Sequence, residues 1–291
     1  MAGPLGIQSF FHEPTFTITH LIWDKKTKKA AVIDPVLDYD PKSGRTGTHA
    51  AQGVLDALKA KGLKLDWILE THAHADHLSA APFLKAATGA PIAIGEHITQ
   101  VQGVFKPVFN LKDLNTDGSQ FDRLVKDGAE LALGDLKIRV LHTPGHTLAC
   151  VSYLVEDAVF VGDTMFMPDY GTARTDFPGG DAASLYRSIK KLLSLPPETR
   201  VFLCHDYLPA GRTAYVWETT IGEQRANNIH IHDGVSESDF VAMRKARDKT
   251  LEMPVLILPS IQVNVRAGQL PAPEDNGVRY LKIPLDALGA V

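Results

Sequence analysis

Three histidines and one aspartate fall within six consecutive residues, in the segment Thr71-His72-Ala73-His74-Ala75-Asp76-His77. Imidazole and carboxylate groups at this density suit a divalent first-row metal such as zinc or iron. His72 and His74 are two residues apart, so both side chains point the same way in an extended backbone. Asp76 and His77 follow as the chain turns, and they can aim at a second point close by. The segment therefore predicts a metal centre.

Ligand-type residues also follow three other predicted strands. A short apolar strand over 66–71 precedes the histidine segment, and His146, Asp163 and His205 follow further apolar runs that end near residues 140, 161 and 204. Ligands in α/β proteins gather beyond the carboxyl ends of strands, on loops that a rigid sheet holds. Each residue alone could be structural, but four strands that all end at such residues predict one shared site.

The composition narrows the class of protein. The chain has 291 residues, of which 44% are hydrophobic and 22% charged, which is typical of a globular protein with a large core. The net charge of -4 gives no general attraction to nucleic acid or to anionic membranes. The first six residues lack the pattern of a secretory signal, and two cysteines are too few for a disulfide framework. We therefore expect a cytoplasmic protein.

Hydrophobic periodicity predicts strands and helices that alternate along the chain, which favours sheets covered by helices. The expected elements are a hairpin of strands 15–23 and 30–34, a loop over 38–48, a helix over 51–61, a helix start at 78–84, a strand over 91–95, uneven structure over 103–128, hairpins over 130–140 and 150–161, a helix capped by Asp181, a strand over 200–204, a helix from Ser236 to near Glu252, and an irregular tail from Pro254.

The motifs together resemble the metallo-β-lactamase fold, on the residues Thr71 to His77, Thr143-Pro144-Gly145-His146, Gly162-Asp163 and Cys204-His205-Asp206. The resemblance implies an α/β chain built as an αββα sandwich, in which helices flank two mixed β-sheets and one or two metals lie at the sheet edge. It further implies a single domain over 1–291. Residues 10–210 would form the metal-binding core, and 211–291 a C-terminal helix with an irregular covering segment.

Other stretches resemble one branch of that fold, the persulfide dioxygenases in their bacterial form. They are 169–177, 205–207 and the tail 258–268, although Ala267 stands where some relatives have a cysteine. The resemblance implies oxidation of glutathione persulfide by O₂ and water to sulfite and glutathione. It implies one Fe(II) per chain on His72, His146 and Asp163, which also serve as the catalytic residues. The remaining metal-type residues would surround this iron or hold a second metal: His74, Asp76, His77 and His205.

The expected substrate has two carboxylates and needs cations near the metal. Arg174 and Arg212 each lie in a loop that follows a candidate ligand, and arginine can bind a carboxylate through two hydrogen bonds. Tyr170 and Tyr207 can add a hydroxyl and an apolar face. Each of these side chains could instead make an ordinary structural contact. Cys150 and Cys204 are expected to be small buried packing residues.

The main alternative is a dinuclear zinc hydrolase of the glyoxalase II kind, acting on the thioester of a hydroxyacylglutathione. It would use the same ligand residues, and zinc has no redox chemistry of its own. A β-lactam hydrolase, a nucleic-acid-processing relative and a metal-dependent sensor fit the sequence less well. We expect small molecules as partners, with no nucleic acid and no membrane, and a possible homodimer.

Overall fold

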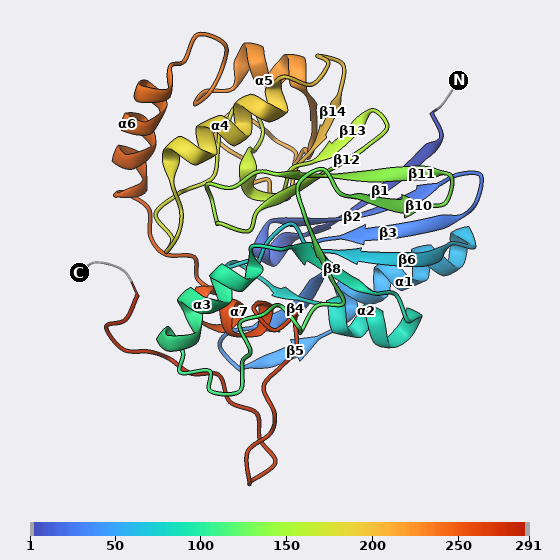
Figure 1. Cartoon of the computed structure of the whole chain (residues 1–291), viewed down its shortest axis with the longest axis vertical. Helices are drawn as coiled ribbons and strands as arrows, with labels where there is room; N and C mark the ends of the chain where they lie inside the picture. Colours follow the sequence, from blue (N-terminus) through green and yellow to red (C-terminus); the bar gives the residue numbers. More distant parts are fainter. Residues whose placement is uncertain (1–2, 289–291) are drawn as a thin grey trace.

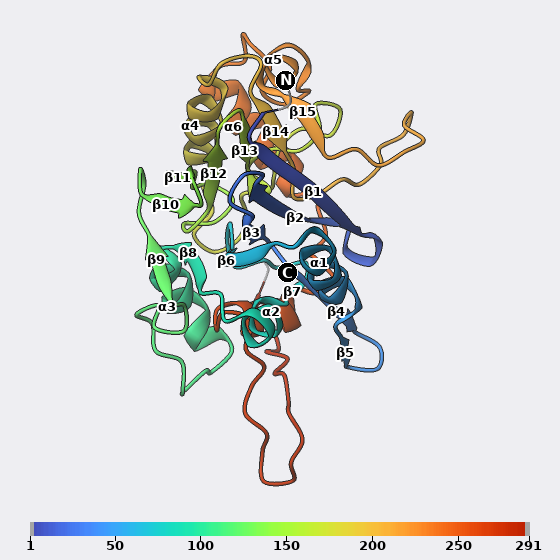
Figure 2. The same cartoon turned by 90° about the vertical axis from the view of Figure 1, so that its right-hand side faces the viewer.

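The computed structural model describes residues 3–288. Residues 1–2 and 289–291, which belong to the expected 1–291 domain and in part to the segment searched for a secretory signal, lie outside the described residues. Two six-stranded sheets face each other, and helices cover the outer face of each (Figures 1 and 2). The expected sandwich of two mixed sheets flanked by helices is confirmed.

The first sheet contains both parallel and antiparallel neighbours. Strands β3, β6, β8 and β9 run parallel, whereas β1, β2 and β3 form antiparallel pairs. The sequence analysis missed its first strand. In spatial order the strands are β1 (Leu5–His12), β2 (Thr17–Asp24), β3 (Lys29–Ile33), β6 (Lys64–Leu69), β8 (Ile92–Gly95) and β9 (Arg123–Val125).

The second sheet is antiparallel except at one pair. Strand β13 pairs with β14 in parallel, because helix α4 connects them across the sheet. The predicted hairpins over 130–140 and 150–161 are confirmed as β10–β11 and β12–β13. In spatial order the strands are β10 (Glu130–Leu133), β11 (Leu136–His142), β12 (Val151–Val155), β13 (Ala158–Phe160), β14 (Arg200–Phe202) and β15 (Glu218–Thr220).

A small third sheet corrects two predictions. The segment 38–48 was expected to be a loop, but most of it pairs as β4 (Val36–Asp40) with β5 (Arg45–Gly47). The segment after His77 was expected to begin a helix, but it first forms β7 (Leu78–Ser79) against β4. Helix α2 begins only at Ala81, where Pro82 fits the first turn.

Among residues 3–288, four helices cover the first sheet and three cover the second. Those on the first sheet are α1 (His49–Lys61), α2 (Ala81–Thr88), α3 (Ile98–Val108) and α7 (Ile257–Asn264). Those on the second are α4 (Ala182–Leu193), α5 (Ile221–Asn227) and α6 (Glu237–Asp248). The expectation of an irregular tail from Pro254 was wrong at α7, whose residues are almost all buried.

Adjacent residues of the first sheet enter different cores. Leu21 packs among the helices outside the sheet, whereas Ile22 packs between the two sheets. In β6, Ile68 likewise packs among the helices and Leu69 between the two sheets. Because side chains alternate across a strand, a sheet covered on both faces has continuous apolar strands. This packing holds the carboxyl end of β6, where the histidine segment begins, in a fixed position.

The predicted helix starts are confirmed by their caps. The Asp181 carboxylate accepts a hydrogen bond from the Ser184 amide at 2.7 Å, and the Ser236 hydroxyl accepts one from the Asp239 amide at 3.2 Å. Within residues 3–288, no helix is long and apolar enough to cross a membrane.

Candidate metal centre

The seven candidate ligands lie together at the edge where the two sheets meet. The histidine segment follows β6 of the first sheet, and the other ligands follow β11, β13 and β14 of the second. Backbone hydrogen bonds join the sheets at this edge, from the Val151 amide to the Thr71 carbonyl at 2.9 Å and from the Ile18 amide to the Cys204 carbonyl at 2.7 Å. The four strand ends therefore share one site.

Two glycines allow the loops to approach closely. Gly162 has φ +51°, and a Cβ there would come within 2.6 Å of the Thr71 hydroxyl. Gly145 has φ +137°, and a Cβ there would come within 2.3 Å of the Leu185 backbone. Any other residue at these positions would strain the backbone and push the loops away from Thr71 and from helix α4. These contacts explain why glycine precedes both Asp163 and His146.

One buried group consists of His72, His146 and Asp163, whose ligand-type atoms all lie within 4.8 Å of one another. The Asp163 Oδ2 atom is 3.9 Å from His72 Nε2 and 3.6 Å from His146 Nε2. These distances exceed a hydrogen bond and leave room for an ion between the three atoms. Two imidazoles and one carboxylate that face one point form the donor set of non-haem iron sites, and such a set also accepts zinc.

The other oxygen of Asp163 faces a second group. His205 Nε2 lies 3.2 Å from Asp163 Oδ1 and 3.3 Å from Asp76 Oδ2. His74, Asp76 and His77 also form a compact set. Asp163 can therefore bridge two ions, or bind one ion through Oδ2 while His205 holds Oδ1.

Unpartnered polar atoms show that the site fits a cation. Buried polar side-chain atoms nearly always have hydrogen-bond partners, so several without one in a single place need an explanation. Those at this site include His72 Nε2, His74 Nδ1 and His77 Nε2. Burial alone would lower the pKa of His205, but the Asp163 and Asp76 carboxylates raise it to about 9. The field that attracts a proton here also attracts a metal ion.

The ring nitrogens that face away from the centre are hydrogen-bonded, which fixes each imidazole. His72 Nδ1 lies 3.0 Å from the Thr71 hydroxyl, and His146 Nδ1 lies 2.9 Å from the Arg174 carbonyl. His74 Nε2 lies 2.9 Å from Asp34 Oδ1. Such contacts orient metal-binding histidines and set their basicity.

Asp34 is a site residue that the sequence analysis missed. Its carboxylate accepts hydrogen bonds from the Thr71 amide at 2.7 Å and the Thr71 hydroxyl at 2.9 Å, in addition to its contact with His74. Burial would raise the pKa of Asp34, but His74 and these bonds lower it to about 2, so the carboxylate stays ionised. Asp34 ends the apolar strand 30–34, and the rule applied to the other strand ends could have found it.

Asn264, at the end of α7, was also missed. Its amide nitrogen donates to the carbonyls of His74 at 2.8 Å and His77 at 2.7 Å, and its oxygen accepts from the Ser79 amide at 2.9 Å. One buried side chain from the C-terminal region thus holds the histidine segment at three points. No local pattern predicts this contact, because about 190 residues separate its partners in the chain.

A cleft of about 460 Å³ opens over the centre, a size typical of small-molecule sites. The candidate ligand Asp163 lines it, together with Tyr170 and Tyr207. The two tyrosine rings stack at 4.9 Å between centroids, and Tyr207 also stacks on His205. Neither tyrosine hydroxyl is hydrogen-bonded to another described residue, so both can serve a ligand.

The two predicted arginines are already paired. Arg174 lines the cleft, but it binds the Asp176 carboxylate at 2.6 and 2.7 Å and the Glu252 carbonyl at 2.6 Å. Arg212 does not line the cleft, and it binds the carboxylates of Asp206 and Asp169. The expectation that Arg212 reaches the rim is corrected, because these two carboxylates hold it beside its own loop.

Two arginines of helix α6, Arg244 and Arg247, line the cleft and were missed by the sequence analysis. Arg244 is buried, where it pairs with Asp248 at 2.7 Å and donates to the Thr172 carbonyl at 3.0 Å. Asp248 in turn accepts two hydrogen bonds from Thr175. These bonds anchor α6 on the loop 172–175. Arg247, one turn on, is exposed and lines the cleft, and no other described residue pairs with its guanidinium.

The cysteines behave as expected for packing residues. Both are buried and free. Burial raises the pKa of the Cys150 thiol to about 12, and burial beside Asp34 raises the pKa of Cys204 well above its usual range. Both shifts disfavour the thiolate, which is the nucleophilic form of cysteine.

Residues 14–205 match the Metallo-beta-lactamase superfamily. The chain is 59% identical to a probable metallo-hydrolase of Burkholderia pseudomallei, over 98% of this chain and 100% of that protein. It is 51% identical to Glyoxylase B2 of Dictyostelium discoideum, over 99% of both chains.

More distant relatives differ in the share of the chain that they match. The crystal structure of ETHE1 from Myxococcus xanthus is similar with a TM-score of 0.73 and 31% identity, over 91% of this chain and 100% of that one. The mitochondrial persulfide dioxygenase ETHE1 of Homo sapiens is 27% identical over 91% of this chain and 90% of its own. A hydroxyacylglutathione hydrolase of Methylococcus capsulatus is 36% identical, but over only 59% of this chain and 61% of its own.

Proposed function

The chain belongs to the metallo-β-lactamase superfamily, and on that premise we propose that it is a persulfide dioxygenase. The reaction joins glutathione persulfide, O₂ and water to give sulfite, glutathione and protons. The terminal sulfur is oxidised, O₂ is reduced, and the sulfur–sulfur bond breaks with the glutathione thiol as the leaving group. The proposal includes one Fe(II) per chain, held by His72, His146 and Asp163.

The observation that carries the proposal is the donor set at the base of the cleft. Two imidazoles and one carboxylate form a compact buried group, and His74 falls outside it, in the separate set with Asp76 and His77. Three protein ligands on one face leave other positions open for two further reactants. A bound iron would supply the redox chemistry that O₂ requires, which zinc lacks.

Contacts with other groups of the protein would keep these ligands in position. His146 donates its Nδ1 proton to the Arg174 carbonyl, which leaves Nε2 free for the metal. His205 lies against Asp163 Oδ1 and would hold that oxygen while Oδ2 binds the ion. Asn264 fixes the backbone on both sides of Asp76.

The cleft offers groups suited to the tripeptide part of the substrate. Arg247 is the cleft arginine that no other described residue pairs, so we propose that it binds a glutathione carboxylate in place of Arg174 or Arg212. The Tyr170 and Tyr207 hydroxyls would donate to the same molecule. Similarity to persulfide dioxygenases over about nine-tenths of the chain supports this assignment, because α6 and α7 complete the cleft and the centre.

A second candidate is a dinuclear zinc hydrolase acting on a hydroxyacylglutathione thioester. The group of Asp76, Asp163 and His205, together with the unpartnered His77 Nε2, favours it, because these atoms could hold a second ion. The name of the Dictyostelium relative points the same way.

Two assays on one preparation separate the candidates. Iron-loaded protein should consume O₂ with glutathione persulfide, release sulfite, and remain inactive with reduced glutathione alone. Rapid hydrolysis of lactoylglutathione without O₂ uptake would instead establish the hydrolase. A protein loaded with zinc in parallel serves as the control, since the dioxygenase should lose activity with that metal.

A further inference from the structure

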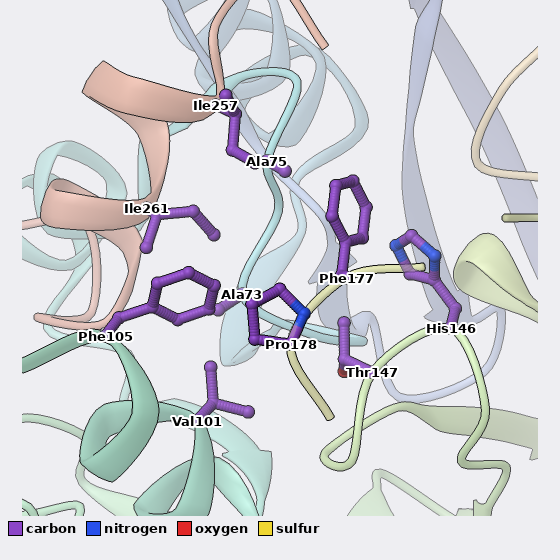
Figure 3. A pocket seen from close by; sticks show the side chains of 10 residues that line it. All are labelled: Ala73, Ala75, Val101, Phe105, His146, Thr147, Phe177, Pro178, Ile257 and Ile261. Carbon is purple, nitrogen blue, oxygen red and sulfur yellow. The ribbon is translucent and has the colours of Figure 1, made fainter. Parts of the chain in front are cut away.

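The metal centre is closed on the side of α3 and α7 and open toward the cleft. On the closed side, apolar side chains such as Phe105, Phe177 and Ile261 fill the space beside His146 (Figure 3). They leave a gap of only about 10 Å³, the lower limit for one water molecule, so no substrate enters there. Substrate contacts must therefore come from the open cleft, and the segment 14–16, just before β2, forms part of its lining.

Within this segment, Phe16 combines a strained backbone with an exposed aromatic ring. Its φ of +55° lies in the left-handed region, which bulky side chains rarely adopt. The residue is 36% exposed although it is large and apolar, and it lines the cleft. A strained conformation persists only where surrounding contacts impose it, and such residues cluster at functional sites.

Contacts with the metal centre hold the Phe16 backbone in this conformation. His205 Nδ1 donates to the Phe16 carbonyl at 3.1 Å, and the Asp206 amide donates to the same oxygen at 3.2 Å. The hydroxyl of the next residue, Thr17, donates to Asp76 Oδ2 at 3.2 Å. The Phe16 carbonyl therefore orients the His205 ring, whose Nε2 faces the metal centre.

The ring of Phe16 extends an aromatic surface that begins at His205. Its centroid lies 5.7 Å from that of Tyr207, and Tyr207 stacks on both His205 and Tyr170. Tyr170 and Tyr207 are half-buried, whereas Phe16 is exposed, so Phe16 is the outer end of this surface. An aromatic ring in this place can cover the peptide part of a ligand whose sulfur end reaches the metal.

We propose that Phe16 is a specificity-determining residue whose ring packs against the peptide part of the glutathione moiety. The inference rests on the proposed function for the identity of the substrate, although a hydroxyacylglutathione would present the same tripeptide. The carbonyl of Phe16 orients His205, and its ring binds the ligand. These two tasks explain the strained backbone, because rotation of φ to an ordinary value would turn the carbonyl away from His205 or the ring away from the cleft.

The test measures ligand binding without turnover. S-methylglutathione is a thioether that neither candidate reaction consumes, and calorimetric titration of zinc-loaded protein gives its Kd. Phe16→Gly removes the ring but keeps the backbone conformation, which glycine adopts freely. Its affinity should fall roughly three- to tenfold, the effect of losing one aromatic contact, with the zinc content unchanged. Phe16→Tyr keeps the ring and should bind as the wild type does.

Glu156→Gly is the matched control. Glu156 has φ +52° in the turn between β12 and β13 and does not line the cleft, so the substitution relieves the same strain and should leave the Kd unchanged. Phe16→Leu, which lacks an aromatic face, replaces Phe16→Gly if that variant does not fold or loses its zinc.

The possible results separate this inference from the proposed function. An unchanged Kd in a folded, zinc-loaded Phe16 variant that lacks the ring would overturn the role of Phe16 alone. An equal loss of affinity in Glu156→Gly would also overturn it. If the wild-type protein did not bind S-methylglutathione at all, both the inference and the proposed glutathione substrate would be wrong.

Discussion

Polar and charged side chains at the base of the cleft differ from those at its rim in which of their atoms have hydrogen-bond or ion-pair partners. At the base, one ring nitrogen each of His72, His74 and His77 is buried without a partner, although the other nitrogen of each ring is hydrogen-bonded. At the rim, Arg174 is bound by the carboxylate of Asp176, two residues away, whereas the exposed Arg247 stays unpaired among residues 3–288.

The difference shows what residue type can and cannot predict. Leaving a buried polar atom unpaired costs about 1–3 kcal/mol, so a cluster of such atoms indicates a missing ligand. An exposed arginine pairs with any nearby carboxylate at little cost, so its type does not reveal its role. Ligand groups are therefore easier to recognise at the base than at the rim.

The largest expected effect follows removal of a base residue. His72→Ala deletes one of three donors and should reduce bound iron to background, because two remaining protein ligands hold the ion poorly. Elemental analysis of the purified variant measures this. His97→Ala is the control, because His97 lies outside the site. Full metal occupancy in His72→Ala would contradict the assignment of the base.

Asn264→Ala tests whether the base depends on support from α7. The variant loses hydrogen bonds to the His74 and His77 carbonyls and to the Ser79 amide, so metal affinity should fall roughly 10–100-fold. A competition titration with a chelator measures the affinity. Asn276→Ala removes an exposed asparagine and should leave it unchanged. A variant with normal affinity and lowered thermal stability would limit Asn264 to a structural role.

Arg247→Ala tests the unpaired arginine at the rim of the cleft. Loss of a charge-assisted contact at an exposed position should raise the KM for glutathione persulfide roughly tenfold, or about 1.4 kcal/mol, with iron content unchanged. Arg247→Lys should recover part of the loss because it keeps the charge. Lys245→Ala, on the same helix but outside the cleft, is the control. An unchanged KM in Arg247→Ala would show that the carboxylates are bound elsewhere.

Arg212→Ala should have the smallest effect on catalysis. It leaves the buried Asp206 carboxylate without its main partner, so stability should fall by about 1–3 kcal/mol while the KM stays unchanged. Thermal unfolding and steady-state kinetics on one sample measure both quantities. A large rise in KM without a loss of stability would show that Arg212 contributes to substrate binding.

The sequence predicted the base because its signals are local. Each apolar strand ends within a few residues of a ligand-type side chain, and sheet topology brings such ends together. Gly145 and Gly162 fit the same pattern, since close contacts require them.

The rest of the site depends on contacts between distant segments. Asn264 reaches the histidine segment across about 190 residues, and α6 reaches the cleft through the Arg244–Asp248 pair. Most residues of helix α7 are buried, so its sequence lacks strong amphipathic spacing. For this reason the sequence analysis took it for an irregular covering segment. The pairing of Arg212 with Asp169 and Asp206 depends on how two loops fold together, which spacing does not encode.

The most direct test of the account is metal analysis of the protein purified without added metal. The persulfide dioxygenase proposal predicts about one iron atom per chain, held by His72, His146 and Asp163, and little zinc. Two zinc atoms per chain, with no iron, would contradict the persulfide dioxygenase proposal and favour the thioester hydrolase.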